Sequence, residues 1–267
     1  MVYILLILFF MVGSIIGSFL NVCAYRIPRS ESIMFPGSHC PACGGAIAPY
    51  DNIPIVSYLL LRGTCRHCRG RIGIRYPLVE LTTGALWAAV YYRFGLSSQL
   101  AGALFFVTVL TVLSAIDYDT KTLPDKLLLP SIGLSALALL LYPIQIDALP
   151  LIAGSGVLRA MFGFVAGGGL LLIVALLGML VFKREAMGGG DIKLAAFMGL
   201  YLGGYVVLAI FIGTFLGTLA GTALMARGKA ESKSSMPFGP FLAAGAIVTI
   251  FIGPQLWLGY LKFAGLA

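Results

Sequence analysis

Residues 160–181 read AMFGFVAGGGLLLIVALLGMLV and contain no charged side chain. In a helix, about 20 apolar residues of this kind span the hydrocarbon core of a bilayer. The composition agrees, because 60% of the 267 residues are hydrophobic and only 10% are charged. Soluble domains average about 25% charged residues. We therefore predict an all-α polytopic membrane protein.

Apolar runs of similar length recur along the chain. They predict about eight transmembrane helices, at 2–23, 77–95, 99–116, 127–142, 160–181, 192–208, 209–226 and 238–257. Only Gly203 and Gly204 separate the sixth run from the seventh, and residues 143–159 fit either a loop or a re-entrant segment. No basic residue precedes the first run, so we expect it to be a retained span rather than a cleaved signal peptide.

The positive charges fall mostly on one side of this arrangement. Eight spans would place 15 of the 18 lysine and arginine residues on one side, and only Arg93, Arg159 and Lys262 on the other. The side rich in lysine and arginine normally faces the cytoplasm. The net charge of +8 is then explained by topology and by attraction to anionic lipid. We expect the lipid bilayer, and not nucleic acid, to be its partner.

The polar segment between the first two runs carries two CxxC pairs, in HCPAC (39–43) and GTCRHC (63–68). Two such pairs about 20 residues apart have the ligand spacing of a small zinc unit. The four predicted ligands are Cys40, Cys43, Cys65 and Cys68. Two disulfides are the alternative, which a reducing cytoplasm disfavours. Because four thiolates leave no open coordination position, we expect the metal to be structural.

Two aspartates lie at the ends of apolar runs, Asp117 in AIDYDTKTLPD (115–125) and Asp191 in MGGGDIKL (187–194). A carboxylate close to the bilayer interior is costly and marks a functional site. Two carboxylates that share a proton can activate water, which suggests an intramembrane aspartic protease. The residues alone do not separate Asp117 from Asp119 and Asp125, and Asp191 could simply cap a helix.

Glycine and proline lie beside these acids. Three glycines before Asp191 allow positive φ angles and a close approach of another chain, as an extended substrate would need. The sequence PFGP (237–240) is either a gate, an edge that pairs with extended substrate, or an ordinary turn. The predicted substrate-binding residues are Gly188, Gly189, Gly190, Pro237, Phe238 and Gly239. The glycine-rich runs 166–170 and 213–221 predict close helix packing.

Six motifs occur in an order that resembles one family. They are GSFLNVCAYRIP (17–28), RGTCRHCRGRI (62–72), YPLVEL (76–81), AIDYDTKTLPD (115–125), AMGGGDIKL (186–194) and PFGPFLA (237–243). Together they cover nearly the whole chain and resemble the type IV prepilin peptidases. Members of this family are bifunctional leader peptidases and N-methyltransferases, and they belong to the GxGD type of intramembrane aspartic protease.

The resemblance implies that Asp117 and Asp191 are catalytic. Members cut the short basic leader from type IV prepilins or pseudopilins at the cytoplasmic face of the bacterial inner membrane. They then methylate the new N-terminal residue with S-adenosylmethionine, in support of type IV pili or type II secretion. The resemblance also divides the chain into a first transmembrane helix (1–23), a cytoplasmic zinc-binding domain associated with methyl transfer (24–76) and a transmembrane peptidase domain (77–267).

Three polar residues near the first two runs are candidates for the methyl-transfer site. Asn21, Arg26 and Glu80 could hold the cofactor or the new amine; alternatively, Glu80 and Arg26 form an ion pair that fixes helix packing. Other functions remain open at this stage: a peptidase without methyl transfer, a proton-coupled transporter, or a non-catalytic assembly scaffold.

Overall fold

The computed structural model describes residues 2–141, 156–183, 187–227 and 236–265. Within these ranges the secondary structure is helical, and only two isolated β-bridges occur. The longer helices are α1 (Val2–Arg26), α3 (Arg75–Phe94), α4 (Gln99–Thr120), α5 (Asp125–Leu141), α6 (Gly156–Phe182), α7 (Gly189–Leu202), α8 (Val206–Ala226) and α9 (Gly239–Phe263). The prediction of an all-α membrane protein is confirmed. The interpretation of residues 143–159 falls almost entirely outside the described residues.

The number of membrane spans differs from the prediction. Five segments of the described chain are long and apolar enough to cross a bilayer: Val2–Arg26, Gln99–Thr120, Gly156–Val181, Gly189–Ala226 and Gly239–Phe263. Helix α3 carries Arg75, Glu80 and Arg93, and α5 has only 17 residues. The predicted count of eight spans is therefore not confirmed, although a helix occupies each of the predicted runs.

The predicted break at Gly203 and Gly204 is a 3-10 turn, η2 (Gly203–Tyr205). Gly203 has a φ of 54°, a left-handed conformation that glycine adopts without steric penalty. Gly167 of α6 lies against Ala195 before the turn and Val206 after it, so the chain folds back there. Helix α7, with 14 residues, is about 21 Å long and too short to cross a bilayer alone.

Neighbouring helices approach closely where one of them carries glycine. Gly17 of α1 lies against Glu80 of α3, and Gly213 of α8 lies against Phe241 of α9. In the run 166–170, the first two glycines lie against α7, whereas a methyl group added at Gly169 would have no other atom within 4 Å. Small residues let helix backbones pack tightly in a membrane. The predicted close packing is thus confirmed at Gly167, Gly168 and Gly213, whereas Gly169 has open space and Gly217 and Gly221 make only ordinary contacts with side chains.

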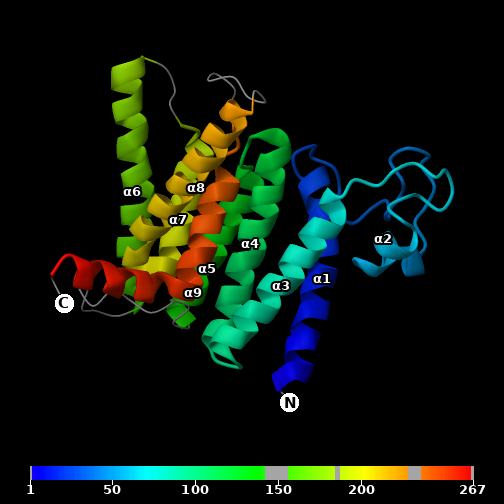
Figure 1. The fold of residues 1–267 in the computed structure, drawn as a ribbon, viewed down its shortest axis with the longest axis horizontal. Coiled ribbons are helices and arrows are strands. Elements are labelled where there is room, and N and C mark those ends of the chain that lie inside the picture. Colours follow the sequence, from blue (N-terminus) through cyan, green and yellow to red (C-terminus); the bar gives the residue numbers. More distant parts are fainter. Residues whose placement is uncertain (1, 142–155, 184–186, 228–235, 266–267) are drawn as a thin grey trace.

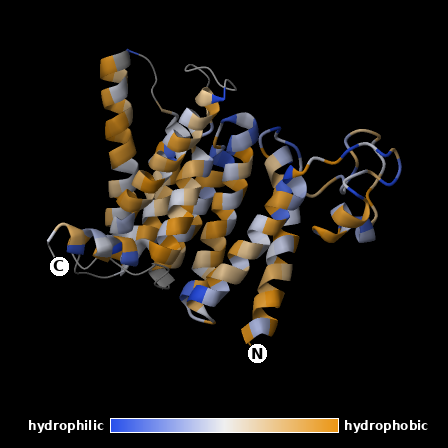
Figure 2. Cartoon of the chain, in the orientation of Figure 1, coloured by the Kyte–Doolittle hydropathy of each residue, from blue (hydrophilic) through white to orange (hydrophobic). Residues whose placement is uncertain are grey.

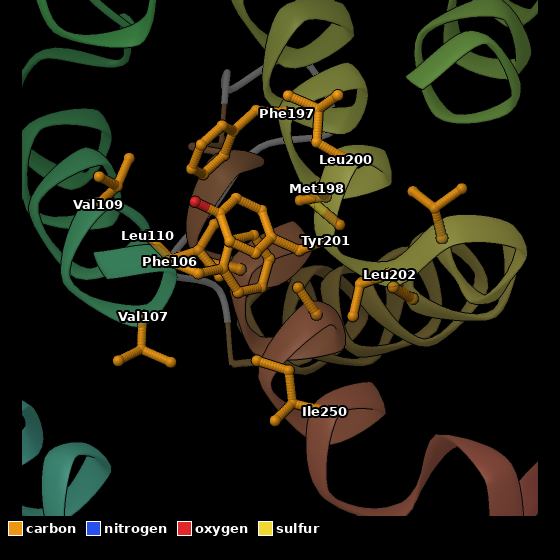
Figure 3. Packing of buried hydrophobic residues seen from close by; sticks show 14 of the residues in the cluster. Phe106, Val107, Val109, Leu110, Phe197, Met198, Leu200, Tyr201, Leu202 and Ile250 are labelled. Atoms are coloured by element: carbon orange, nitrogen blue, oxygen red, sulfur yellow. The ribbon is translucent and has the colours of Figure 1, made fainter. Parts of the chain in front are cut away.

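An aromatic cluster joins α4, α5 and α7 at the centre of the bundle. Phe106 stacks on Tyr201 with their ring centroids 4.4 Å apart, and Phe197 packs edge-on against Tyr201 (Figure 3). The Tyr201 hydroxyl is hydrogen-bonded to Ser135 Oγ at 2.8 Å, as a buried phenol requires. This core fixes the relative positions of α4 and α7, the two helices that carry Asp117 and Asp191.

A second structural unit lies at one side of the bundle. Helices α1 and α3 pack against each other, and the polar loop between them projects sideways with the short helix α2 (Val56–Leu60) (Figure 1). Most residues of the long helices are hydrophobic, whereas blue hydrophilic residues gather in this loop and at the helix ends (Figure 2). Many large apolar side chains of these helices are exposed. The arrangement is that expected of a bundle embedded in lipid.

Candidate functional site

Asp117 lies in the last turn of α4, because that helix continues to Thr120 instead of ending at residue 116 as predicted. Its side chain is buried, and Oδ2 accepts a hydrogen bond of 2.8 Å from the backbone N–H of Gly239. Gly239 is the first residue of α9, where backbone N–H groups have no partner within the helix. A methyl group on Gly239 would lie 2.9 Å from Asp117 Oδ2, so a larger residue would displace the carboxylate.

Asp191 is the third residue of α7. The helix cap is Gly188, and Asp191 makes no side-chain capping hydrogen bond, so its interpretation as a simple N-cap is wrong. An acidic side chain in the first turn still interacts favourably with the helix dipole. The start of α7 packs against the segment that follows Asp117, because Gly190 lies against Leu123 and Lys193 pairs with Asp125. This places the Asp191 carboxylate within electrostatic range of Asp117. The structure therefore brings together the two acids selected from the sequence.

The glycines before Asp191 act through close contact and not through unusual backbone angles. Gly188 has a φ of −69°, and Gly189 and Gly190 belong to α7, so the expected use of positive φ is wrong. A methyl group on Gly190 would lie 2.7 Å from Leu123 Cβ, so the close neighbour at that position is Leu123 of the chain itself, and the approach of an extended substrate stays a prediction. A methyl group on Gly189 would have no other atom within 4 Å, so one side of the motif is open.

Two ion pairs flank the acids. Arg75, the first residue of α3, pairs with Asp119 and donates to the Ala115 carbonyl at 3.2 Å. Lys193 lies 2.7 Å from the carboxylate of Asp125. Both pairs are partly exposed to solvent, where an ion pair contributes about 0–1 kcal/mol. Asp119 and Asp125 therefore have surface partners, which leaves Asp117 as the buried acid of its segment.

The four predicted metal ligands also come together. The sulfur atoms of the two CxxC pairs all lie within 4.8 Å of one another, and Cys40 Sγ and Cys68 Sγ are 3.9 Å apart. Four thiolates about 2.3 Å from a tetrahedral zinc ion would be about 3.8 Å apart, so the cluster fits such an ion. All five cysteines are free thiols, which argues against the disulfide alternative.

Each CxxC pair forms the same tight turn. The N–H of Cys40 donates to the Gly45 carbonyl, and that of Cys65 donates to the Gly70 carbonyl, both at 2.9 Å. Backbone N–H groups also face the first sulfur of each turn. Those of Ala42 and Cys43 lower the pKa of the Cys40 thiol to about 7, because a hydrogen bond stabilises the thiolate. The backbone N–H groups thus stabilise a thiolate at the first cysteine of each turn, since the pKa of the Cys65 thiol is lowered in the same way.

The histidines next to these cysteines are not part of the sulfur cluster. His39 and His67 are exposed, and His39 Nδ1 is 3.1 Å from the Gly37 carbonyl. Cys23 is buried near the end of α1. Among the described residues, the group that could hold a metal ion is therefore the cysteine tetrad predicted from the spacing.

Asn21, Arg26 and Glu80 do not form one hydrogen-bonded cluster. Arg26 donates to the carbonyls of Ser32, Pro36 and Gly37 at 2.9, 2.7 and 3.4 Å. The ion pair between Arg26 and Glu80 is not formed, so that alternative is wrong.

The other two members hold different parts of the unit. Asn21 Nδ2 donates to the Tyr76 carbonyl at 3.0 Å, whereas its buried Oδ1 has no partner among the described residues. Glu80 Oε2 accepts the backbone N–H of Ile55 at 2.7 Å. Arg26 and Glu80 thus connect the loop to α1 and α3. The Oδ1 atom of Asn21 is a buried hydrogen-bond acceptor in α1 with no partner among the described residues.

Sequence reasoning missed two residues near the buried acids. Arg75 counted only toward the charge distribution, although it holds the end of α4. Leu123 served only as part of the Leu-Pro element that locates Asp117, yet it is the residue against which Gly190 packs. Both contacts join segments far apart in the chain, and an isolated sequence carries no signal for them.

Comparison with known proteins agrees with this geometry. Residues 11–94 match the bacterial peptidase A24 N-terminal domain, and residues 104–222 match the type IV leader peptidase family. A prepilin leader peptidase/N-methyltransferase from Pseudomonas aeruginosa is 36% identical over 96% of this chain and 93% of its own length. One from Bacillus subtilis is 33% identical over 96% of this chain and 97% of its own. No solved structure matches. The chain belongs to the type IV leader peptidase family of membrane aspartic peptidases and N-methyltransferases.

Proposed function

We propose that Asp117 and Asp191 are the catalytic pair that removes the basic leader from type IV prepilins or pseudopilins. The observation that carries the proposal is the buried Asp117 carboxylate, which accepts the N–H of Gly239 and lies within electrostatic range of Asp191 on a separate helix. The ionised acid takes a proton from water as the water attacks the scissile carbonyl. The neutral acid donates a proton to the carbonyl oxygen. No covalent intermediate is required.

The substrate would reach this pair from the open side of the glycine motif. Nothing lies within 4 Å of a methyl group on Gly189, so an extended chain could approach Asp191 there. Pro237 and Phe238 are half-buried immediately before α9, and we assign them, with Gly188, to the same substrate groove. The excess of positive charge at this end of the predicted helices supports a cytoplasmic location of the site in a bacterial inner membrane.

We infer that the unit formed by α1, the loop and α3 carries methyl transfer. Zinc held by the four cysteines would cross-link the loop, which is too small to build a hydrophobic core. The buried Oδ1 of Asn21, which has no hydrogen-bond partner among the described residues, is a candidate acceptor for the amino or hydroxyl groups of S-adenosylmethionine, with Arg26 and Glu80 on the same pair of helices. The division at 23/24 and 76/77 remains a proposal; α1 ends at Arg26 and α3 begins at Arg75.

The peptidase proposal is tested by Asp117→Asn and Asp191→Asn in purified protein given a prepilin and labelled S-adenosylmethionine. Each variant should lose leader cleavage but still methylate a pilin supplied without its leader. Asp125→Asn is the matched control, because it makes the same chemical change in an exposed ion pair. Leader removal by either of the first two variants would refute the assignment.

The methyl-transfer proposal is tested separately with Asn21→Ala. Ser14 is its matched control, since Ser14 Oγ is also buried in α1 without a partner among the described residues. We expect Asn21→Ala to raise the S-adenosylmethionine concentration needed for methylation, with cleavage unchanged. Equal effects of Asn21→Ala and Ser14→Ala would show that Asn21 contributes only to packing.

A further inference from the structure

Large apolar side chains are exposed along the segment 53–61, which contains α2. The exposed fractions are 49% for Ile53, 48% for Val56, 68% for Leu59 and 78% for Leu60. The opposite side of the segment faces the loop, where Ser57 is buried. Ser57 Oγ accepts the N–H of Ile53 at 3.1 Å and donates to the Tyr50 carbonyl at 2.9 Å. The segment therefore turns a fixed apolar face outward.

The depth of this segment follows from its hydrogen bond to α3. Ile55 donates to Glu80, which lies five residues after the start of α3 and faces Gly17 of α1. Gly17 is nine residues before the end of α1, so the contact lies about 14 Å below that end. Figure 1 agrees, because α2 lies beside the half of α1 that carries its C-terminus and not beyond it.

That depth corresponds to the outer part of a bilayer. Helix α1 has 25 residues and is about 37 Å long, so it exceeds a hydrocarbon core of about 30 Å by a few Å at each end. The contact with Glu80 then lies about 10 Å inside the hydrocarbon boundary. Interfacial helices bury their apolar faces about 5–10 Å into the region between headgroups and acyl chains.

Exposed arginines follow the apolar face directly. Arg62 is the next residue after the segment, and Arg69 and Arg71 lie within ten residues of it. Arginines beside an apolar face suit anionic headgroups above acyl chains, and each contributes about 1 kcal/mol near such a surface. On α1 at a comparable level, Ile15 and Phe19 are also exposed and would contact the same lipid.

The backbone holds the segment at a cost. Ile55 has a φ of 64° and a ψ of −51°, and the N–H of Val56 donates to the Pro54 carbonyl at 2.6 Å. This tight turn is strained, particularly for a β-branched residue. Such strain persists only where the surroundings impose it, and here Glu80 receives the N–H of the strained residue. The hydrogen bond to Glu80 thus fixes the orientation of α2 relative to α3.

We propose that residues 53–61 form an interfacial membrane anchor that holds the cysteine-bearing unit against the leaflet beside α1 and α3. The apolar helix of a substrate and a second copy of this chain are the other possible occupants of the face. The bilayer is favoured because the segment lies at the depth of lipid and is followed by arginines.

The test uses two single variants, Leu59→Trp and Leu60→Trp. Both positions are exposed and have room for the larger ring. The matched control is Ala46→Trp, at an exposed residue of the cysteine-bearing unit outside the segment. Each variant, and the parent protein with its own tryptophans, is reconstituted in vesicles of phosphatidylethanolamine and phosphatidylglycerol. Part of the lipid carries bromine on acyl carbons close to the headgroup or close to the bilayer centre.

We expect the added tryptophan at 59 or 60 to emit at shorter wavelength than at 46 and to be quenched by the shallow bromines more than by the deep ones. An unquenched tryptophan with water-like emission would overturn the proposal. A tryptophan that is unquenched by lipid but shifts when prepilin is added would assign the face to substrate. A signal that depends on the protein-to-lipid ratio would assign it to a second copy, and each of these results rejects the anchor.

Discussion

Gly190→Ala should separate the catalytic acids without unfolding the protein. The new methyl group would lie 2.7 Å from Leu123 Cβ, whereas two carbon atoms in contact are ordinarily about 3.5–4.0 Å apart. The start of α7 and the segment around Leu123 must therefore move apart by about 1 Å. Asp191 follows directly, so it moves with the helix start. A misplacement of about 1 Å at a catalytic site costs about 100-fold in rate, equivalent to about 2.7 kcal/mol.

The cost in stability should be smaller. Overpacking costs about 1–3 kcal/mol, and alanine recovers about 1 kcal/mol relative to glycine inside a helix. Gly169→Ala is the matched control, because Gly169 lies in α6 with no atom within 4 Å of the new methyl group. We expect that control to keep wild-type cleavage and to gain about 0.5–1 kcal/mol from helix propensity.

The assay follows leader cleavage of a prepilin by mass in detergent, together with thermal unfolding of each variant. Methylation of a pilin without its leader provides an internal measure of folding. The reasoning is refuted if Gly190→Ala remains folded and cleaves at the rate of Gly169→Ala. A loss of methylation equal to the loss of cleavage would instead indicate general unfolding.

Further predictions concern the cysteine-bearing unit and its contact with α4. Removing metal with a chelator, or introducing Cys65→Ser, should abolish methyl transfer and spare cleavage. The metal content and the masses of both products check this prediction. A parallel loss of both activities would contradict it. Arg75→Gln should change stability by no more than about 1 kcal/mol but slow cleavage, and a double-mutant cycle with Asp119→Asn should show that the two changes are not additive. Arg69→Gly should stabilise the metal-loaded unit by up to about 1 kcal/mol, because Arg69 has a φ of 58° at the position that Gly44 occupies in the first CxxC turn. A lower unfolding temperature of this variant would show that Arg69 is not strained.

The helices could be predicted because a bilayer leaves the backbone no other way to satisfy its hydrogen bonds. The cysteine cluster could be predicted because the CxxC spacing itself sets the geometry of each turn. The predicted end of α4 at residue 116 was wrong for a physical reason. Asp117 and Asp119 interrupt the apolar run but not the backbone hydrogen bonds, so the helix continues to Thr120.

Other features depend on contacts between distant segments. The N–H of Gly239 reaches Asp117 across 122 positions of sequence, and nothing in either motif specifies that partner. The three glycines before Asp191 also concealed the helix start, because glycine is both a permitted cap and a flexible linker. The backbone is already helical from Gly189, and Gly190 packs there on Leu123.

Arg75 gives the two proposed activities a common structural element. It opens α3, which Asn21 joins to α1 and Glu80 joins to the cysteine-bearing loop, and it holds the last turn of α4 through Asp119 and the Ala115 carbonyl. Asp117 lies in that same turn. A shift of α3 during substrate or cofactor binding would therefore be transmitted through Arg75 to the turn that carries Asp117. Slower cleavage in Arg75→Gln with an unchanged fold would support this path, and full cleavage would show that the two units act independently.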